Sequence, residues 1–391
     1  MDTMDALNDA PVVQLLDKVL REAVRLNASD VHFESFLDGF KIRCRVDGVV
    51  VNLISPPAQL FSPLISRIKV LANLDVAESR VPQDGRMVVN VDDKEIDMRV
   101  STLPTVFGES VVLRVLDKER GVVSVDELGI WDEDVAKFKR LFSLANGMVL
   151  VTGPTGSGKT TTLYSFMNEL NTIDKKIITT EDPVEYDMQG TVQIPIDPKI
   201  GLDFAKSLRT ILRQDPDIIM VGEIRDEETA QIAVQAALTG HLVLSTLHTN
   251  NAPGAITRLI DMGIEPYLIT STLRAVIAQR LVRKICPKCI DSYKPTSAEM
   301  EAFGLREADG PFFKGAGCDF CNGSGYKGRT GLFEFLEVGK ELHFAIMERI
   351  STTGIREKAI EMGMVSIRED GLRKARKGIT TLEEVFKETQ L

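Results

Sequence analysis

The most constraining feature of this sequence is a glycine-rich segment, Gly-Pro-Thr-Gly-Ser-Gly-Lys-Thr, at residues 153–160. It matches the phosphate-binding loop pattern G-x-x-x-x-G-K-[ST] at every fixed position. An apolar, β-rich run at residues 148–152 precedes it, and residues 161–170 have the pattern of a helix. A strand that turns through glycines into a helix N-terminus points several backbone N–H groups at one anion. The segment therefore predicts a nucleotide-binding site, because a chance glycine-rich turn would lack this strand and helix context.

The residue types in this loop suit the phosphates of a nucleotide. Glycines let the backbone wrap a phosphate without a Cβ clash. Lys159 is expected to neutralise the β- and γ-phosphates of a nucleotide, and the Thr160 hydroxyl is expected to ligate Mg²⁺. The residues expected to contact the nucleotide are Gly153, Pro154, Thr155, Gly156, Ser157, Gly158, Lys159, Thr160 and Thr161.

Length, charge and hydropathy narrow the class of protein. A chain of 391 residues leaves room for about two to three domains. No apolar run reaches the roughly 18 residues that a membrane span needs, and no signal peptide begins the chain, so we expect a cytoplasmic protein. A net charge of -10 argues against a large non-specific nucleic-acid surface, while leaving room for a local basic channel.

The first part of the chain has the pattern of a small α+β domain, which we place at residues 1–116. Apolar residues recur at helical spacing over residues 11–26, and a second helix is expected at residues 63–71. Asp47 and Gly48 have the composition of a hairpin turn. The expected strands are residues 31–34, 41–46, 87–91, 95–100 and 110–116. The charged segment 117–125 is the expected linker.

From about residue 126 the pattern changes to alternating helices and buried strands, which predicts a doubly wound, largely parallel α/β sheet. The expected strands are residues 148–152, 176–180, 218–221 and 241–246, and the expected helices include residues 203–213, 227–238 and 266–283. This domain is expected to span residues 126–391. It includes a cysteine-rich excursion at residues 284–330 and a helical part at residues 338–391.

Two acidic segments follow predicted strands and are therefore expected at the same edge of the sheet. Glu223 follows the strand at residues 218–221, where it could hold the Mg²⁺ shell or activate water. Glu181 begins the cluster Glu-Asp-Pro-Val-Glu at residues 181–185. For both segments the alternative is a solvated surface carboxylate. His248 follows the fourth strand and is either a sensor of the γ-phosphate or a structural histidine.

Four of the five cysteines form two C-x-x-C pairs, Cys286 with Cys289 and Cys318 with Cys321. Four thiolates in this pattern suit tetrahedral Zn²⁺, and a four-cysteine site leaves no open position, so its role is expected to be structural. The gap between the pairs exceeds the commonest zinc-ribbon spacing, which leaves four free thiols as the alternative. The fifth, Cys44, is expected to be a packing residue in a strand.

These motifs occur in an order that resembles the secretion ATPases of type II secretion and type IV pili. Residues 153–160, 181–185, 221–226 and 246–250 look like the Walker A, Asp box, Walker B and His box of that family. Residues 280–283 and 329–331 are also similar. The resemblance covers nearly the whole chain, and it implies a PAS-like N-terminal domain joined to a RecA-like P-loop ATPase domain. It further implies a homo-hexameric ring that hydrolyses ATP to ADP with Mg²⁺.

The resemblance assigns roles to residues of the nucleotide site. It implies that Lys159 and Thr160 bind phosphate and Mg²⁺. It also implies that Glu223 is the catalytic glutamate, that Glu181 assists it and that His248 senses the phosphate.

Three arginines gain a role from the resemblance alone. Arg99 and Arg114 resemble arginines that reach the nucleotide, and Arg209 matches a further arginine that follows the Asp box. Guanidinium groups stabilise the charge that develops in γ-phosphoryl transfer. Without the resemblance, Arg99 and Arg114 would be interpreted as surface charges of strands.

The expected function is a hexameric motor at the cytoplasmic face of the inner membrane, acting on an inner-membrane platform protein. Within the family, the tetracysteine insert is typical of assembly and export ATPases rather than retraction ATPases. Type IV pilus assembly is the preferred branch, and type II secretion through pseudopilus assembly is the alternative. A RecA-like nucleic-acid translocase and a nucleotide-regulated binding module are more distant alternatives. Family members commonly carry another N-terminal module, so this chain is expected to be a truncated piece or a short member.

Overall fold

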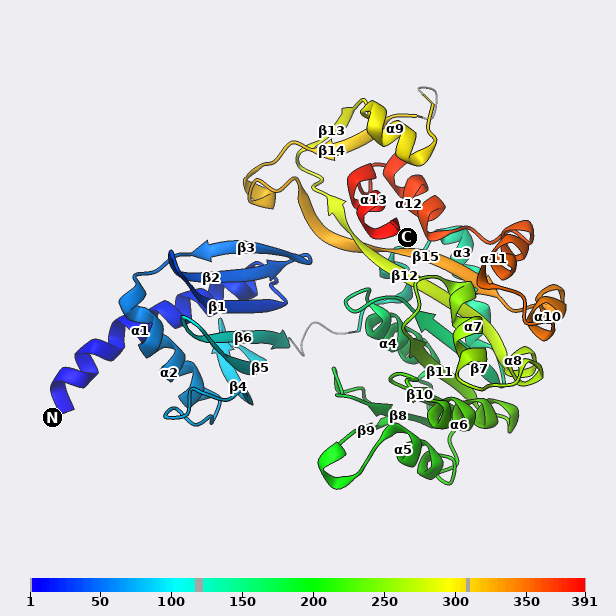
Figure 1. Cartoon of the computed structure of the whole chain (residues 1–391), viewed down its shortest axis with the longest axis horizontal. Coiled ribbons are helices and arrows are strands. Elements are labelled where there is room, and N and C mark those ends of the chain that lie inside the picture. Colours follow the sequence, from blue (N-terminus) through cyan, green and yellow to red (C-terminus); the bar gives the residue numbers. More distant parts are fainter. Residues whose placement is uncertain (1, 117–121, 307–309, 391) are drawn as a thin grey trace. The chain divides into compact units, whose positions relative to one another are not determined.

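The computed structural model describes residues 2–116, 122–306 and 310–390 (Figure 1). The chain divides into two compact units, Met1–Gly121 and Val122–Leu391. The boundary falls within the expected linker at residues 117–125, of which residues 117–121 lie outside the described residues. Val125 is buried in the second unit, so the end of the expected linker packs there. None of the described helices is both long enough and apolar enough to cross a membrane.

The first unit is a six-stranded antiparallel sheet with helices on one face (Figure 1). The strands lie in the order β3-β2-β1-β6-β5-β4. They are β1 (Asp30–Phe36), β2 (Gly39–Val46), β3 (Val49–Ile54), β4 (Gln83–Val91), β5 (Lys94–Thr105) and β6 (Gly108–Leu116). The helices are α1 (Asp2–Arg25), η1 (Ala58–Leu60) and α2 (Phe61–Leu71). Leu16, Leu20 and Ile68 of α1 and α2 share one core with the sheet.

Alternation along the strands separates the two faces of this sheet. In β1, Val31 and Phe33 are fully buried in the core, whereas His32 between them lies on the opposite face. The turn between β2 and β3 has positive φ at Asp47 (48°) and Gly48 (86°). Positive φ at both central residues is the requirement of a type I′ hairpin turn, so the predicted hairpin is confirmed.

The second unit is a seven-stranded sheet in the order β15-β12-β7-β11-β10-β8-β9. Its neighbouring strands pair in parallel, except that β15 is antiparallel to β12. The strands of the unit are β7 (Gly147–Thr152), β8 (Ile177–Glu181), β9 (Thr191–Pro195), β10 (Ile218–Val221), β11 (Leu242–Leu247), β12 (Leu273–Ile285), β13 (Ile290–Tyr293), β14 (Phe312–Gly315) and β15 (Tyr326–Glu337). The helices are η3 (Val125–Leu128), α3 (Asp132–Phe142), α4 (Lys159–Leu170), η4 (Pro198–Ile200), α5 (Phe204–Ile211), α6 (Glu227–Leu238), α7 (Ala252–Asp261), α8 (Pro266–Thr272), α9 (Ser297–Phe303), η6 (Asp319–Cys321), α10 (Lys340–Met347), α11 (Thr352–Glu361), α12 (Ile367–Arg376) and α13 (Leu382–Thr389).

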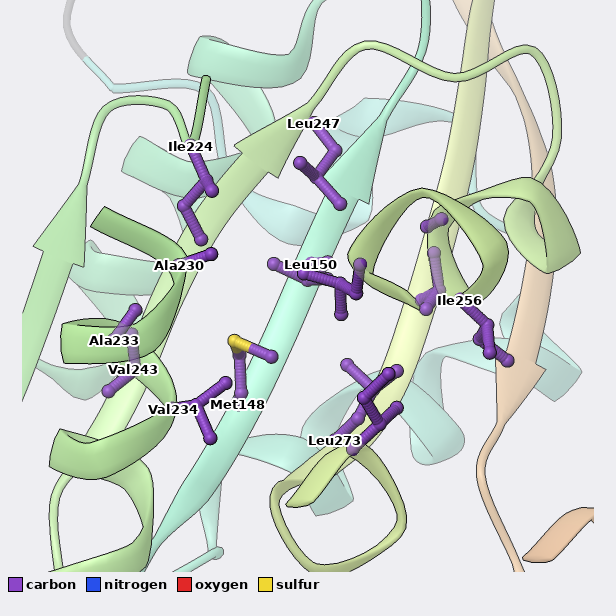
Figure 2. Close-up of a cluster of buried hydrophobic side chains, with 14 of the residues drawn as sticks. Met148, Leu150, Ile224, Ala230, Ala233, Val234, Val243, Leu247, Ile256 and Leu273 are labelled. Atoms are coloured by element: carbon purple, nitrogen blue, oxygen red, sulfur yellow. The ribbon is translucent and has the colours of Figure 1, made fainter. Parts of the chain in front are cut away.

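Apolar runs bury the central strands on both faces. Every residue of β7, β10 and β11 is buried. Helices α3 and α4 pack on one face of the sheet, and α5 to α8 with α10 and α11 pack on the other. Figure 2 shows Met148 and Leu150 of β7 in the second of these cores, with Val234 of α6 and Ile256 of α7. The predicted doubly wound, largely parallel α/β architecture is confirmed.

One predicted helix is wrong. The sequence pattern favours a single helix over residues 266–283, but the structure has the short α8 followed by β12. β12 lies between β7 and β15, so that both Val276 and Ile277 are fully buried although they point to opposite faces. A strand buried on both faces does not alternate between apolar and polar residues, and periodicity alone cannot separate it from a buried helix.

The cysteine-rich excursion is a small module attached to the C-terminal helices. β13 and β14 pair antiparallel, and α9 lies between them in the chain. Residues 307–309 lie outside the described residues. Phe312 of β14 packs with Leu382 and Val385 of α13, which joins the module to the end of the chain.

A buried ion pair lies within α12, and a hydrogen bond to its carboxylate joins this helix to the start of α3. Asp370 accepts hydrogen bonds from Trp131 Nε1 at 2.5 Å, the Phe333 amide at 2.9 Å and Lys374 Nζ at 2.7 Å. Lys374 also donates to the Gly331 carbonyl at 2.6 Å. The side chains of Lys374 and Asp370 are only 2% and 4% exposed.

Replacing Asp370 by alanine is expected to lower the free energy of unfolding by about 3–5 kcal/mol, because the Lys374 ammonium is left buried without its counter-charge. Urea unfolding followed by the fluorescence of Trp131, the single tryptophan, measures this change. The control is Glu265→Ala, which breaks a pair with Arg349 that is more than half exposed and should cost about 0–1 kcal/mol. Equal losses in the two variants would contradict a structural role for the buried pair.

Candidate nucleotide site and four-cysteine cluster

The segment between β7 and α4 has the backbone shape of a phosphate-binding loop. Gly153, Gly156 and Gly158 have φ values of 152°, 79° and 87°. A Cβ atom on Gly153 would lie 2.4 Å from the carbonyl oxygen of Gln279, and one on Gly158 would lie 2.8 Å from Gln279 Nε2. Both positions therefore require glycine. The first turn of α4 has backbone amides without partners within the helix, which can face an anion.

The side chains of the loop fit a nucleotide polyphosphate. Lys159 Nζ lies over the loop and donates to the carbonyl oxygens of Gly153 at 2.9 Å and Pro154 at 3.0 Å. Burial lowers the pKa of Lys159, while the charge of Glu223 opposes this shift. Thr160 is exposed in the first turn of α4, where its hydroxyl could ligate the Mg²⁺ of a bound Mg-ATP.

Glu223 follows β10 and has two basic side chains as neighbours, Arg225 and His248. Arg225 Nη2 donates to Glu223 Oε1 at 2.5 Å, and His248 Nε2 lies 3.2 Å from Glu223 Oε2. Burial acts to raise the pKa of Glu223, but the hydrogen bonds and charges of Arg225 and His248 outweigh it and lower this pKa below its usual value. The carboxylate is therefore ionised at neutral pH and can accept a proton from water.

Hydrogen bonds between strand ends bring these residues to one edge of the sheet. Thr246 Oγ1 donates to the Gly222 carbonyl at 2.8 Å, and the Ile224 amide donates to the Thr246 carbonyl at 3.0 Å. The Thr249 amide donates to Thr152 Oγ1, at the end of β7, at 2.9 Å. The segment that carries His248 is thus tied both to the strand before the phosphate loop and to the segment that carries Glu223.

Glu181 ends β8, but its carboxylate is buried and only 3% of the residue is exposed. Thr179 Oγ1 donates to Glu181 Oε1 at 2.5 Å, and Gln193 Nε2 donates to the same oxygen at 3.2 Å. Tyr164 OH, on α4, donates to Oε2 at 2.5 Å. Burial and this hydrogen bond raise the pKa of Tyr164, so the phenol stays a donor. Glu181 thereby connects β8 to the helix that follows the phosphate loop.

Gln279, a buried residue of β12 that no sequence motif marks, supports the loop. Gln279 Oε1 accepts a hydrogen bond from Thr162 Oγ1 of α4 at 2.7 Å. The next residue, Arg280, donates through Nη2 to the Asn250 carbonyl, two residues after His248, at 2.9 Å. The sequence did carry a signal for these two residues, because Gln279 and Arg280 are polar side chains inside an apolar run. Buried polar groups nearly always have hydrogen-bond partners, so such residues are expected to make specific contacts.

The three arginines to which the resemblance assigns a role at the nucleotide have different surroundings in the structure. Arg209 of α5 pairs with Glu228 at the start of α6. Arg99 and Arg114 belong to the first unit, where they lie directly opposite each other on β5 and β6. Arg114 Nε donates to Asp30 Oδ1 at 3.1 Å. A role of these arginines at a nucleotide is a proposal.

Four cysteines lie close together at the base of the excursion. The sulfur atoms of Cys286, Cys289, Cys318 and Cys321 all lie within 4.8 Å of one another, and three of the pairs are 3.7 or 3.8 Å apart. A tetrahedron with Zn–S bonds of about 2.3 Å places its sulfur atoms about 3.8 Å apart. The cluster therefore fits Zn²⁺ held by four thiolates.

Backbone amides favour the thiolate form of one of these cysteines. The amides of Cys318 and Gly325 donate to Cys321 Sγ at 3.2 and 3.3 Å. Burial acts to raise the pKa of Cys321, but these hydrogen bonds lower it to about 6. A thiolate is the form in which cysteine binds a metal.

Replacing Cys286 by serine is expected to reduce bound zinc, because a hydroxyl is a poor substitute for a thiolate ligand. Atomic absorption of purified protein measures the metal content, and the rate of release to a chelator measures how tightly it is held. Cys44→Ala is the control, since Cys44 is buried in the first unit and lies outside the cluster. Undiminished zinc in Cys286→Ser would show that Cys286 is not a ligand.

Known proteins resemble this chain along nearly its whole length. Residues 5–387 match the family "Type II/IV secretion system protein". The chain is 52% identical over 396 residues to type II secretion system protein E of Xanthomonas campestris pv. campestris, covering 100% of this chain and 70% of the relative. It is 48% identical to type II secretion system ATPase E of Vibrio cholerae, covering 100% and 77%. It is 47% identical to the type IV pilus assembly ATPase PilB of Myxococcus xanthus, covering 98% and 69%.

Solved structures share the fold. The ATPase DotB of Legionella pneumophila superposes with a TM-score of 0.71 at 24% identity, covering 95% of this chain and 94% of DotB. The pilus retraction motor PilT, solved with bound ADP, superposes with a TM-score of 0.64 at 26% identity, covering 96% and 97%. The matched family and the curated relatives confirm the resemblance: this chain belongs to the type II/IV secretion system protein family, a family of ATP hydrolases.

Proposed function

We propose that this chain is the ATPase motor of a type II secretion system. The observation that carries the enzymatic part is the set of hydrogen bonds that ties the segments of Glu223 and His248 to the end of the strand before the phosphate loop of Lys159. A phosphate-neutralising ammonium and an ionised carboxylate in one site are the two groups that ATP hydrolysis needs.

The residues of the site perform this hydrolysis in a simple sequence. The phosphates of ATP lie against the amides of the loop and of α4, and Lys159 neutralises the β- and γ-phosphates. Thr160 would hold Mg²⁺ at this position, where the ion would supply positive charge to the phosphate oxygens. Glu223 takes a proton from water as the water oxygen bonds to the γ-phosphorus. The bond from that phosphorus to the β–γ bridging oxygen breaks, and ADP and phosphate leave.

Neighbouring groups link this chemistry to movement. His248 contacts Glu223 and would report the state of the γ-phosphate to the segment that follows β11. Glu181 would assist through its hydrogen bond to Tyr164 of α4, which keeps the helix after the loop in register with β8. Arg99, Arg114 and Arg209 would supply cations to the developing phosphate charge.

The assembly is proposed by analogy with the family. Six chains would form a ring at the cytoplasmic face of the inner membrane, where domain movements act on a membrane platform protein. The relatives from Xanthomonas and Vibrio are named for type II secretion and the Myxococcus relative for type IV pilus assembly. Their names favour type II secretion, the alternative of the sequence analysis, over pilus assembly, which that analysis put first.

The enzymatic and oligomeric parts are tested by ATPase activity against protein concentration, with the mass measured on the same samples. We expect specific activity to rise as a six-chain species forms and Arg114→Ala to lose turnover without losing assembly. Arg21→Ala is the matched control, because Arg21 is another exposed arginine of the first unit paired to a carboxylate. A fully active monomer indifferent to Arg114 would contradict the ring motor.

The choice of branch is tested by deleting the gene in its own bacterium. Loss of enzymes from the culture medium, with pili retained, supports type II secretion. Loss of pili with normal secretion would instead assign the chain to pilus assembly. Restoring the phenotype with the wild-type gene but not with a Glu223→Gln gene would tie it to ATP hydrolysis.

A further inference from the structure

A row of arginines crosses the face of the first unit's sheet that α1 and α2 leave uncovered. Pairing between neighbouring strands places five residues directly opposite one another, from β2 through β1, β6 and β5 to β4. The row consists of Arg45, Asp30, Arg114, Arg99 and Arg86. The next row on the same face contains one arginine, and it consists of Arg43, His32, Val112, Ser101 and Asp84.

This row of arginines does not help to stabilise the fold. Like charges directly opposite each other in a sheet are destabilising, and Arg114, Arg99 and Arg86 are three in succession. Among the residues that the structure describes, no hydrogen bond or ion pair joins the side chain of Arg86 or Arg99 to a partner, and Arg99 Nε is a buried donor without an acceptor. Unpaired cations side by side are a favourable arrangement for a phosphate anion.

Asp30 is the single acid in the row, and it is held in place. Its side chain is 11% exposed, with one oxygen 3.1 Å from Arg114 Nε and the other 3.7 Å from Arg45 Nε. Ser29 Oγ donates to Asp30 Oδ2 at 2.8 Å. The backbone of Ser29 bonds to both neighbouring strands, through its amide to Arg45 and through its carbonyl to Val115. The carboxylate is therefore fixed to the sheet, whereas the Arg114 side chain is 63% exposed.

The geometry of the bond decides what Arg114 can do. Asp30 engages only the Nε of Arg114, on one edge of the guanidinium. A guanidinium has five N–H donors, and no other residue in the described part of the chain bonds the four on the terminal nitrogens, which can make bidentate contact with phosphate oxygens. An exposed arginine without such an anchor must lose more side-chain freedom when it meets a ligand.

We propose that Asp30 is a positioning residue of the ATPase, which holds Arg114 by its Nε so that the terminal nitrogens face the phosphate. The inference rests on the proposed function, in which Arg114 contacts the nucleotide. Asp30 touches neither substrate nor reacting atoms, and it acts through Arg114 alone.

The test is steady-state ATPase kinetics of Asp30→Asn at a protein concentration where the wild type is assembled. We expect kcat to fall about 10- to 100-fold, because without the bond from Asp30 the guanidinium group of Arg114 is no longer held in the position from which it contacts the phosphate. The KM for ATP and the midpoint of thermal unfolding should change little, because the Arg114 side chain is mostly exposed and asparagine keeps the size of Asp30 and a hydrogen-bond acceptor. Glu34→Gln is the matched control: it breaks an ion pair between β1 and β2, with Arg43, on the same face of the sheet, and should leave kcat unchanged.

A double mutant separates positioning from a structural role. Asp30→Asn in an Arg114→Ala background should have the same kcat as Arg114→Ala alone, because the group that Asp30 positions is already absent. A further loss in the double mutant, or a wild-type kcat in Asp30→Asn beside an impaired Arg114→Ala, overturns the inference while the proposed function stands. A fully active Arg114→Ala overturns both the proposed role of Arg114 and this inference.

Discussion

Glu223→Gln is expected to remove ATP hydrolysis while ATP binding is retained. Glutamine has nearly the shape of glutamate, but it cannot take a proton from water, and a positioned general base contributes about 10²- to 10⁴-fold to a rate. In the structure the carboxylate is ionised, because Arg225 and His248 together lower its pKa despite its burial. The loss should therefore appear in kcat across neutral pH.

Two measurements together check this expectation. Phosphate release gives kcat, and titration with a fluorescent ATP analogue gives the dissociation constant. Glu227→Gln is the matched control, since Glu227 is an exposed carboxylate four residues along the chain in the first turn of α6. If Glu223→Gln kept its turnover, another group would be the base; if it lost nucleotide binding, the main role of Glu223 would be in the Mg²⁺ shell.

Lys159→Ala is expected to abolish nucleotide turnover by a different route, through loss of binding. The ammonium lies over the loop, held by the carbonyl oxygens of Gly153 and Pro154, where the charge of the β- and γ-phosphates has to be neutralised. Without it, the phosphates would meet a loop that offers only backbone amides. We expect at least a tenfold higher dissociation constant for ATP and no measurable phosphate release.

Lys206→Ala is the control for this second prediction. Lys206 also donates to a backbone carbonyl in its own segment, that of Gly201, but it is exposed and belongs to α5. Circular dichroism should show both variants folded, so that a difference between them reports on the site. Unchanged ATPase activity in Lys159→Ala would refute the assignment of the loop.

Much of the fold could be predicted because local chemistry decides it. The turn at Asp47 and Gly48 needs positive φ, and these residue types adopt it readily. The strand before the phosphate loop is an apolar run bounded by glycine, as is usual for a central parallel strand. The error at residues 266–283 arose where burial on both faces of β12 removed the alternation that would have marked a strand.

The sequence predicted which residues belong to the candidate site, but it predicted few of their hydrogen-bond partners. Lys159 and Glu223 belong to motifs whose spacing fixes their chemistry, and the structure brings both to one site. The surroundings of Glu181 could not be predicted, because two of the three partners of its carboxylate, Tyr164 of α4 and Gln193 of β9, come from other elements of the chain. The role of Gln279 could not be predicted for the same reason, since its hydrogen-bond partner Thr162 lies more than a hundred residues away in the chain.

The sequence by itself determined the phosphate loop, the paired cysteines and the alternation of strands and helices around the loop, because each depends on neighbours within a few residues. Only the tertiary structure decided which charges face each other. The row from Arg45 to Arg86 exists because five neighbouring strands of the sheet, among them β1 and β6 from distant parts of the sequence, align at one register. Strand order and register are set by burial of the opposite face against α1 and α2, a long-range condition that no local pattern contains.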